Sequence, residues 1–226
     1  DSDALRVFRN TCRHQNMMVL DQATGQCDVI QCRYHGWRYR LDGTFLSAPP
    51  LVAPAEPLDP SNNLAPLRTT MLAGLIIGHL GTNPAAFEPE HGVAALCGAA
   101  ADDLILAGSF VTELACNWKI VIEHALASGA VFQWPLLLMR PHAKGLQVAQ
   151  VVPRSFVRTR VVSYLLTRGA ADADSAPALD DIKAHATRIK EACEVRQKQV
   201  ELGEYDIPND ERISRFRQRV LVSVSG

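Results

Sequence analysis

The stretch that decides the fold runs from residue 12 to residue 35 and reads CRHQNMMVLDQATGQCDVIQCRYH. It opens with Cys12-Arg13-His14 and closes with Cys32-Arg33-Tyr34-His35, so each end supplies one cysteine and one histidine. Seventeen residues separate the two groups. Because thiolates and imidazoles are the side chains that bind iron and zinc, the pattern C-x-H, then C-x-x-H, predicts a metal centre held between two loops.

Two such loops can hold a [2Fe–2S] cluster, with both cysteines on one iron and both histidines on the other. Neutral histidines in place of two thiolates raise the reduction potential, into the range of roughly −150 to +300 mV. Zinc is the alternative metal, since two cysteines and two histidines also make a tetrahedral zinc set. Zinc fingers, however, pair Cys with Cys and His with His along the sequence. The pattern therefore favours a Rieske-type cluster, with Cys12, His14, Cys32 and His35 as ligands.

The composition is that of an ordinary globular protein of 226 residues, with 47% hydrophobic and 21% charged residues. Its net charge is −1, which gives no general attraction to nucleic acid or to an anionic membrane. The longest apolar stretch, residues 71–80, is too short to span a bilayer. No signal-peptide pattern opens the chain, so we expect a cytoplasmic location. The four other cysteines are expected to be small buried thiols rather than disulfides: Cys27, Cys97, Cys116 and Cys193.

Local patterns predict β-structure first and a mixed region later. Short strands are expected at residues 5–8, 28–31 and 37–41, with a turn at Asp42-Gly43, a proline-rich extended linker at 47–60 and a buried strand at 71–80. After Asn117 the apolar spacing becomes helical. Residues 146–152 and 157–166 are expected to pair as a hairpin around Pro153. A helix capped by Asp180 carries the stripe Ile182, Ala186, Ile189, Cys193 and Val200, and a last helix from about 208 presents Ile213, Phe216 and Val220.

The residues around the two loops resemble one family. Residues 9–14 and 32–39, followed by Asp42-Gly43 and Pro49, are similar to the α-subunits of Rieske non-haem iron oxygenases. This family comprises the aromatic-ring-hydroxylating dioxygenases and also includes choline- and carnitine-oxidising members. Respiratory Rieske proteins fit less well, because Met17 and Tyr34 stand where their extra disulfide falls, and Trp37 stands where they carry a serine.

The resemblance continues along most of the chain. Residues 71–78 resemble the strand that opens the family's catalytic domain, and residues 134–138 and 158–161 resemble its late strands. Cys116-Asn117-Trp118-Lys119 followed by Glu123 resembles the entry to its active-site helix. Cys193-Glu194, Gln197 and Tyr205 resemble its C-terminal helix.

The family also implies a mononuclear iron held by two histidines and one carboxylate. Ala127 stands where the acidic residue that bridges the two metal centres is expected, Ala130 where the first histidine is expected, and Ile189 where the carboxylate is expected. The segment that carries the second histidine is missing, which indicates an internal deletion near residues 130–131. The pairs Glu123 with His124 and Asp181 with His185 are interpreted as solvated helix residues, and His79, His91 and His142 as loop residues; none is assigned a metal.

These observations together predict an α+β protein in two parts. Residues 1–59 form a small all-β Rieske [2Fe–2S] domain without its N-terminal strands. Residues 60–226 form an incomplete catalytic-type domain, a helix on an antiparallel sheet in the manner of a helix-grip fold. Because the chain begins at Asp1 and enters strand-like sequence at once, we expect a fragment or a gene that has lost pieces.

Three functions are compatible with the sequence. The first is a terminal oxygenase that receives electrons from a reductase or ferredoxin and activates O₂ at a mononuclear Fe(II), but the missing ligands argue against it. The second is an electron-transfer or structural α-like subunit without catalysis, either in a homotrimer or with a complete α-subunit as partner. The third is a non-functional fragment. The substrate cannot be read from these residues, since specificity depends on the site and not on the fold.

Overall fold

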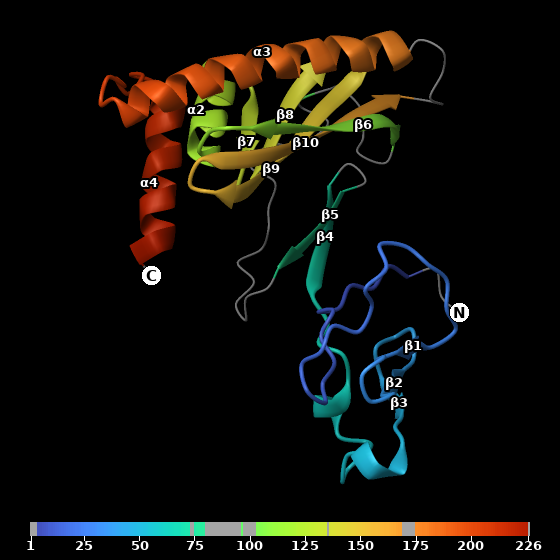
Figure 1. The fold of residues 1–226 in the computed structure, drawn as a ribbon. Coiled ribbons are helices and arrows are strands. Elements are labelled where there is room, and N and C mark those ends of the chain that lie inside the picture. The colour runs from blue at the N-terminus through green and yellow to red at the C-terminus, as the bar shows by residue number, and fades with distance from the viewer. Residues whose placement is uncertain are drawn as a thin grey trace. The chain divides into compact units, whose positions relative to one another are not determined.

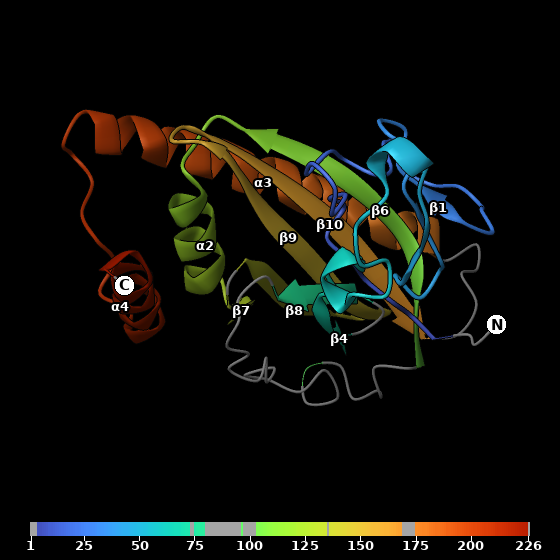
Figure 2. The same ribbon diagram turned by 90° about the horizontal axis from the view of Figure 1, so that it is seen from below.

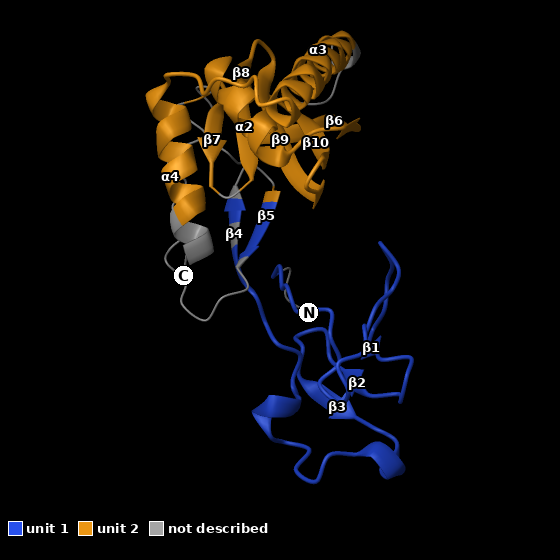
Figure 3. Cartoon of the chain, turned by 60° about the vertical axis from the view of Figure 1, so that its left-hand side comes forward, with its two compact units in different colours: residues 1–71, 76–87 blue, residues 72–75, 88–226 orange. Residues whose placement is uncertain are grey.

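The computed structural model describes residues 4–72, 75–79, 103–134, 136–168 and 175–225, together with Leu96. His91 and Cys97 lie outside the described residues, as do residues 73–74 and 80 of the strand predicted at 71–80. The chain divides into two compact units, coloured in Figure 3. Unit 1 comprises residues 1–71 and 76–87, and unit 2 comprises residues 72–75 and 88–226.

Unit 1 contains a small antiparallel sheet of three strands, β1 (Ile30–Gln31), β2 (Arg38–Tyr39) and β3 (Phe45–Ser47), in the order β1-β2-β3. The strands predicted at 28–31 and 37–41 are therefore confirmed, although each is only two residues long. The strand predicted at residues 5–8 is wrong. This segment makes a single bridge from Phe8 to Pro66, with one backbone hydrogen bond on either side, from the Leu67 N–H to Val7 and from the Arg9 N–H to Ala65. This pairing is too short to form a strand.

The predicted turn at Asp42-Gly43 is confirmed, and a close contact explains its glycine. Gly43 has a φ of +85°, and a Cβ at this position would lie 2.4 Å from the Phe8 ring, so a side chain is excluded both by conformation and by space. The Asp42 carboxylate accepts a hydrogen bond from the Thr44 N–H at 2.9 Å and closes the turn.

The proline-rich segment at 47–60 is not an extended linker. It contains the 3₁₀-helix η1 (Pro50–Val52), and a second, η2 (Pro60–Asn62), begins at its end. The Trp37 indole N–H donates to the Val52 carbonyl at 2.8 Å, and Ala48 and Val52 pack against the core of unit 1. The segment therefore covers part of the core of unit 1, because the burial of Ala48 and Val52 outweighs the preference of a proline-rich chain for an extended conformation.

Residues 71–80 are not one buried strand. They fall into β4 (Arg68–Leu72) and β5 (Leu75–His79), which form a two-stranded sheet. Met71 is 58% exposed and Ile76 is 51% exposed. Apolar composition alone predicted burial here, but a two-stranded sheet leaves side chains accessible on its faces.

Unit 2 is built on a five-stranded antiparallel sheet with the order β6-β10-β9-β8-β7 (Figures 1 and 2). Its strands are β6 (Leu104–Leu114), β7 (Val131–Gln133), β8 (Leu137–His142), β9 (Gly145–Ser155) and β10 (Arg158–Arg168). The predicted hairpin is confirmed as β9 and β10, but its turn lies at residues 156–157 and Pro153 pairs with Thr159 inside the ladder. The predicted α+β fold class is therefore confirmed.

Helix α2 (Trp118–Ala127) confirms the helical period that begins after Asn117. The Asn117 side chain caps it by accepting from the Lys119 N–H at 3.0 Å. Its apolar side chains join the largest core of unit 2, together with residues of β7, β8, β9, α3 and α4. This core contains Leu114, Cys116, Ile120, Val121, Ile122, Ala125, Leu126, Ala130, Phe132, Leu138, Ala149, Val151, Cys193, Ile213, Phe216 and Val220.

Helix α3 (Ser175–Glu201) packs on β6 and α2, and α4 (Glu211–Ser225) closes the chain. The predicted cap at Asp180 is wrong: the helix begins five residues earlier, and Asp180 pairs with Lys183 on the helix surface. The stripe predicted for α4 is confirmed, since Ile213, Phe216 and Val220 are all buried. No helix among the described residues is long and apolar enough to cross a membrane.

Candidate iron–sulfur site

Two loops of unit 1 have the same backbone geometry around Cys12 and Cys32. In each loop the cysteine N–H donates to the carbonyl five residues later, and the cysteine carbonyl accepts from the N–H four residues later. The residue at that fourth position has a positive φ in both loops, +57° at Asn16 and +73° at Gly36. The hydrogen-bond lengths are 2.7 Å for Cys12 to Met17, 3.0 Å for Asn16 to Cys12, 2.8 Å for Cys32 to Trp37 and 3.1 Å for Gly36 to Cys32.

The four predicted ligands come from these loops and are sorted by type. Cys12 and Cys32 are both 2% exposed and belong to the core of unit 1. His14 and His35 are half-buried, and their Nδ1 atoms lie 3.1 Å apart. Among the described residues no three His, Cys, Asp or Glu side chains surround one metal position; the four predicted residues form two pairs instead, with the thiols inside and the imidazoles nearer to solvent.

This arrangement fits a cluster. Two histidine nitrogens that share one metal at roughly 2.1 Å each lie about 3 to 3.5 Å apart, so the observed spacing suits a single iron between His14 and His35. Burial raises the pKa of the Cys12 thiol, and the neighbouring Cys32 raises it further. A cysteine pair beside a histidine pair is the donor set of a Rieske cluster, in which each iron takes one pair.

Tyr39 is a site residue that the sequence did not reveal. Its hydroxyl lies 3.2 Å from the Cys12 Sγ and accepts a hydrogen bond from the Arg13 N–H at 3.2 Å. Since the phenol oxygen accepts from Arg13, its own hydrogen is free to point at the sulfur. Tyr39 is fully buried, and burial is the largest cause that raises the pKa of its hydroxyl above the ordinary value. The phenol therefore stays protonated and can donate a hydrogen bond.

Aromatic and amide side chains fix the two loops. The Trp37 ring stacks on His14 with ring centres 5.1 Å apart and an angle of 9° between the planes. The Asn10 side chain accepts from the N–H groups of Val19 and Leu20 at 3.2 and 2.8 Å. Asn10 lies within the motif that carries the family resemblance, yet its role could not be read there because its partners follow nine and ten residues later.

The positions expected for a mononuclear iron offer it no donor atoms. Ala127 is exposed at the end of α2, Ala130 is 5% exposed in the core, and Ile189 packs against the same core. Methyl and sec-butyl groups do not bind metal, so these residues do not fit the iron of an oxygenase.

The interpretation of Glu123 as a solvated residue is wrong. Glu123 is 3% exposed, and its carboxylate accepts from the Arg217 guanidinium at 2.7 and 2.9 Å and from the Tyr205 hydroxyl at 2.9 Å. The carboxylate raises the pKa of Arg217, and it adds to the effect of burial in raising that of Tyr205. A charge can be buried at this point because Arg217 neutralises it.

The remaining histidines and cysteines differ in part from expectation. His124 and His185 are half-buried rather than solvated, whereas Asp181 is exposed. His79 and His142 are the last residues of β5 and β8, not loop residues. The thiols of Cys116 and Cys193 are buried as expected, but Cys27 is exposed. The five cysteines that the structure describes are free.

Comparisons with known proteins agree with this geometry. The family model described as "Rieske [2Fe-2S] domain" matches residues 1–65. The chain is 31% identical over 126 residues to the carnitine monooxygenase oxygenase subunit of Acinetobacter baumannii, covering 53% of this chain and 33% of that protein. It is 31% identical over 134 residues to the glycine betaine monooxygenase oxygenase subunit of Chromohalobacter salexigens, covering 55% and 28%. The benzene 1,2-dioxygenase subunit alpha of Pseudomonas putida is 28% identical over 128 residues, covering 53% and 28%.

The matched part of the chain thus spans about a third of the length of these curated relatives. Solved structures show the same fold over a larger share. The apo form of the quaternary ammonium Rieske monooxygenase CntA superposes with a TM-score of 0.77 at 20% identity, covering 96% of this chain and 77% of that one. Apo dicamba monooxygenase gives a TM-score of 0.59 at 13% identity, covering 94% and 83%.

Proposed function

We propose that this chain, a Rieske oxygenase α-subunit-like protein whose first 65 residues match the Rieske [2Fe–2S] domain, is an electron carrier that does not itself activate dioxygen. The observation that carries the proposal is the contrast between its two parts. In unit 1 the thiols of Cys12 and Cys32 are buried and the Nδ1 atoms of His14 and His35 lie 3.1 Å apart, which supports a cluster there, while unit 2 has alanine and isoleucine where we expect the iron ligands of an oxygenase.

Cys12, Cys32, His14 and His35 are the residues proposed to hold the cluster. When bound, the cluster supplies one-electron chemistry at a potential set by its ligands, by hydrogen bonds to its sulfurs and by exposure. The protein's own contribution is the environment. Burial keeps water from the thiolates, Tyr39 donates to Cys12, and the half-exposed imidazoles give an electron partner a short path to the site.

The first test is the iron and acid-labile sulfide content per chain after anaerobic reconstitution. We expect two irons and two sulfides, as one [2Fe–2S] cluster requires. Three irons with two sulfides would contradict the proposal, because the third iron would need a mononuclear site.

Replacing Tyr39 with phenylalanine is expected to lower the reduction potential of the cluster. The phenol hydrogen bond to Cys12 stabilises the more negative, reduced state, and phenylalanine removes the hydrogen bond while keeping the ring. The measurement is a redox titration followed by the reduced-state EPR signal. Tyr34→Phe serves as the control, because this tyrosine is 57% exposed and lies on the His35 ring rather than on a cysteine. Equal potentials in the two variants would show that Tyr39 does not tune the site.

A terminal oxygenase is the second candidate, and one observation favours it: the structural likeness to CntA extends over 96% of this chain. In that case the mononuclear iron would have to be bound by residues of this chain outside the expected positions, or by a complete α-subunit in contact with this chain. The same iron count separates the proposal from an oxygenase whose mononuclear iron is held by this chain. Substrate class is open within this candidate, since the relatives are named for carnitine, glycine betaine and benzene.

The proposed partners follow from this role. A reductase or a ferredoxin would deliver electrons, and a homotrimer or a complete α-subunit would receive them. Inter-subunit electron transfer is named for a quaternary ammonium Rieske monooxygenase of similar fold. The division into a Rieske domain at residues 1–59 and a catalytic-type domain at 60–226, the deletion near 130–131 and a cytoplasmic location stay predictions from the sequence.

A further inference from the structure

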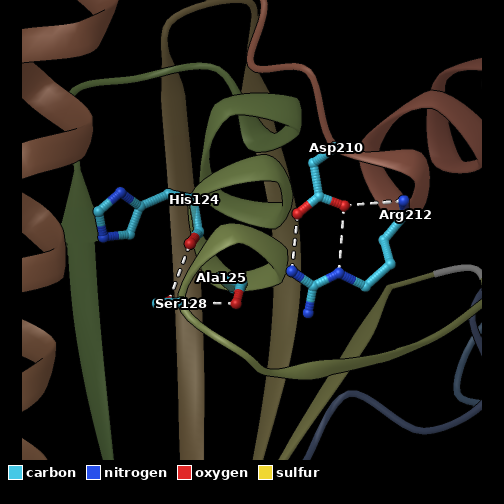
Figure 4. A network of polar contacts seen from close by, with 5 residues as sticks. All are labelled: His124, Ala125, Ser128, Asp210 and Arg212. Carbon is cyan, nitrogen blue, oxygen red and sulfur yellow. Dashed lines mark hydrogen bonds and ion pairs between the residues drawn. The ribbon is translucent and has the colours of Figure 1, made fainter.

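A groove of about 450 Å³ lies between α2 and α3. None of its lining residues belongs to the iron–sulfur loops around Cys12 and Cys32. His124 of α2 lines one side of it, and Figure 4 shows the His124 ring projecting from α2 on the side opposite to Arg212. The α3 side is formed by Arg188, Glu191, Ala192, Val195, Arg196 and Gln199. Glu191 is the one carboxylate among these lining residues.

The groove gathers positive charge that no ion pair among the described residues neutralises. Arg188 and Arg196 of its lining make no ion pair in the part of the chain that the structure describes, and neither does Arg140 of β8, which lies outside the lining. Some arginines elsewhere do pair with carboxylates, as Arg33, Arg160, Arg212, Arg215 and Arg217 do. Unpaired guanidinium groups that are partly removed from water carry a desolvation cost, which an opposite charge would offset.

His124 and His185 each feel the positive charge of neighbouring arginines, and Arg140 acts on both. Burial lowers the pKa of His124, with further lowering by Arg196, His185 and Arg140. Burial also lowers the pKa of His185, with further lowering by Arg140 and Arg188. Five basic side chains from α2, α3 and β8 therefore act on one another.

Two polar atoms of this cluster are buried and have no partner. The Nε2 atom of His185 and the Nη1 atom of Arg196 make no hydrogen bond with any described residue. Arg196 lies over the Tyr205 ring at 5.2 Å, which positions its guanidinium without satisfying that nitrogen. Buried polar groups in folded proteins are almost always hydrogen-bonded, so the Nη1 atom of Arg196, which can only donate, calls for an acceptor that the described residues do not supply.

We propose that the groove between α2 and α3 binds a tetrahedral oxyanion, either free phosphate or the phosphate group of a small monoester. The lining supplies the imidazole of His124 from α2 and the guanidinium groups of Arg188 and Arg196 from α3, whereas a planar carboxylate is matched by the fork of a single guanidinium. Arg140 does not line the groove and contributes only its charge, since its Nη1 and Nη2 donate to the carbonyl and hydroxyl of Ser128 at 2.8 and 3.1 Å. Ser128 is in turn fixed by its bonds to the His124 and Ala125 carbonyls, drawn in Figure 4.

The test is calorimetric titration of the full chain with inorganic phosphate, with methyl phosphate and with acetate, at constant ionic strength. Phosphate is expected to bind saturably and acetate at least tenfold more weakly. Arg196→Gln and Arg188→Gln are each expected to weaken phosphate binding about tenfold or more, because a hydrogen bond to a charged group contributes on that scale. Arg188 is exposed, so its variant keeps the fold even where loss of Arg196 disturbs it.

Arg215→Gln is the matched control. Arg215 is an exposed helix arginine paired with Glu211, and its loss removes the same charge at a distance from the groove. Phosphate affinity within twofold of the unmodified chain in this variant, with the tenfold loss in the other two, supports the site. Heats that do not saturate, equal losses in all three variants, or acetate binding as tightly as phosphate would overturn it. Methyl phosphate binding as well as phosphate identifies a monoester ligand, and its exclusion identifies the free ion.

Discussion

Replacing Cys32 with serine is expected to leave the reconstituted chain colourless and without cluster iron. A serine hydroxyl stays protonated where a cysteine thiol becomes a thiolate, so one iron loses a ligand that no other buried side chain replaces. Cys32 is 2% exposed and its loop is closed by backbone hydrogen bonds to Trp37 and from Gly36. The site therefore cannot recruit a substitute from solvent without opening the loop. Visible absorption and the EPR signal of the reduced protein are the measurements.

Cys27→Ser is the control for this experiment. Cys27 lies five positions earlier in the same segment, but its thiol is exposed and free. Its variant is expected to keep about two irons per chain together with the spectrum of a [2Fe–2S] centre. Colour and EPR signal that survive in Cys32→Ser, or that vanish equally in Cys27→Ser, would remove Cys32 from the ligand set.

Replacing Arg217 with methionine is expected to lower the free energy of unfolding by about 3 kcal/mol. Removing one partner of a buried ion pair leaves the other charge without compensation, which costs about 3–5 kcal/mol. We take the lower end because the Arg217 side chain is 32% exposed, while Glu123 keeps only the Tyr205 hydrogen bond. Urea denaturation followed by circular dichroism gives the midpoint and slope from which the change is obtained.

Arg215→Met on the same helix is the matched control. Arg215 pairs with Glu211 four residues before it, but both side chains are largely exposed, at 75% and 77%. Such a pair contributes about 0.3–0.5 kcal/mol, so the midpoint should barely move. A double variant Glu123→Leu, Arg217→Met is expected to recover much of the stability, since no unpaired charge is then buried. Equal effects of the two single variants would show that the Glu123 ion pair does not hold α4 to α2.

Several elements could be predicted because their signals are local. The period of Trp118, Val121, Ile122 and Ala125 predicted α2, and the spacing of Ile213, Phe216 and Val220 predicted the buried face of α4. The β9–β10 hairpin was predicted because its strands are adjacent in sequence. In each case the residues that form the element lie within one or two turns, or across one tight turn.

The failures share a different cause. Glu123 was interpreted as a solvated helix residue, since its stabilising partners Tyr205 and Arg217 lie 82 and 94 residues away. Residues 47–60 were interpreted as a linker, although Trp37 and the core of unit 1 hold them in place. Local composition cannot report a partner that only the folded chain brings near.

Residues of the family motif near the C-terminus also act through partners that are distant in the sequence. Glu194 accepts a hydrogen bond from the Ala115 N–H and Gln197 from the Asn117 N–H, at 2.8 and 2.9 Å. The sequence pointed to these residues through family resemblance, without a physical reason. The structure supplies it: Gln197 of α3 satisfies the N–H of Asn117, the cap of α2, which the helix itself leaves unpaired, and Glu194 satisfies that of Ala115 in the segment leading to the cap.

The sequence by itself determined which donor atoms the chain offers. Two cysteines and two histidines at fixed spacing predict a metal cluster, and alanine and isoleucine stand where the family resemblance leads us to expect iron ligands, because donor atoms are a property of residue type. Tertiary structure alone decided which groups share an environment. It buried Glu123 against Arg217, set Tyr39 beside Cys12, and brought His124, His185 and Arg140 within electrostatic reach of one another, since burial and long-range contact arise only when distant segments pack together.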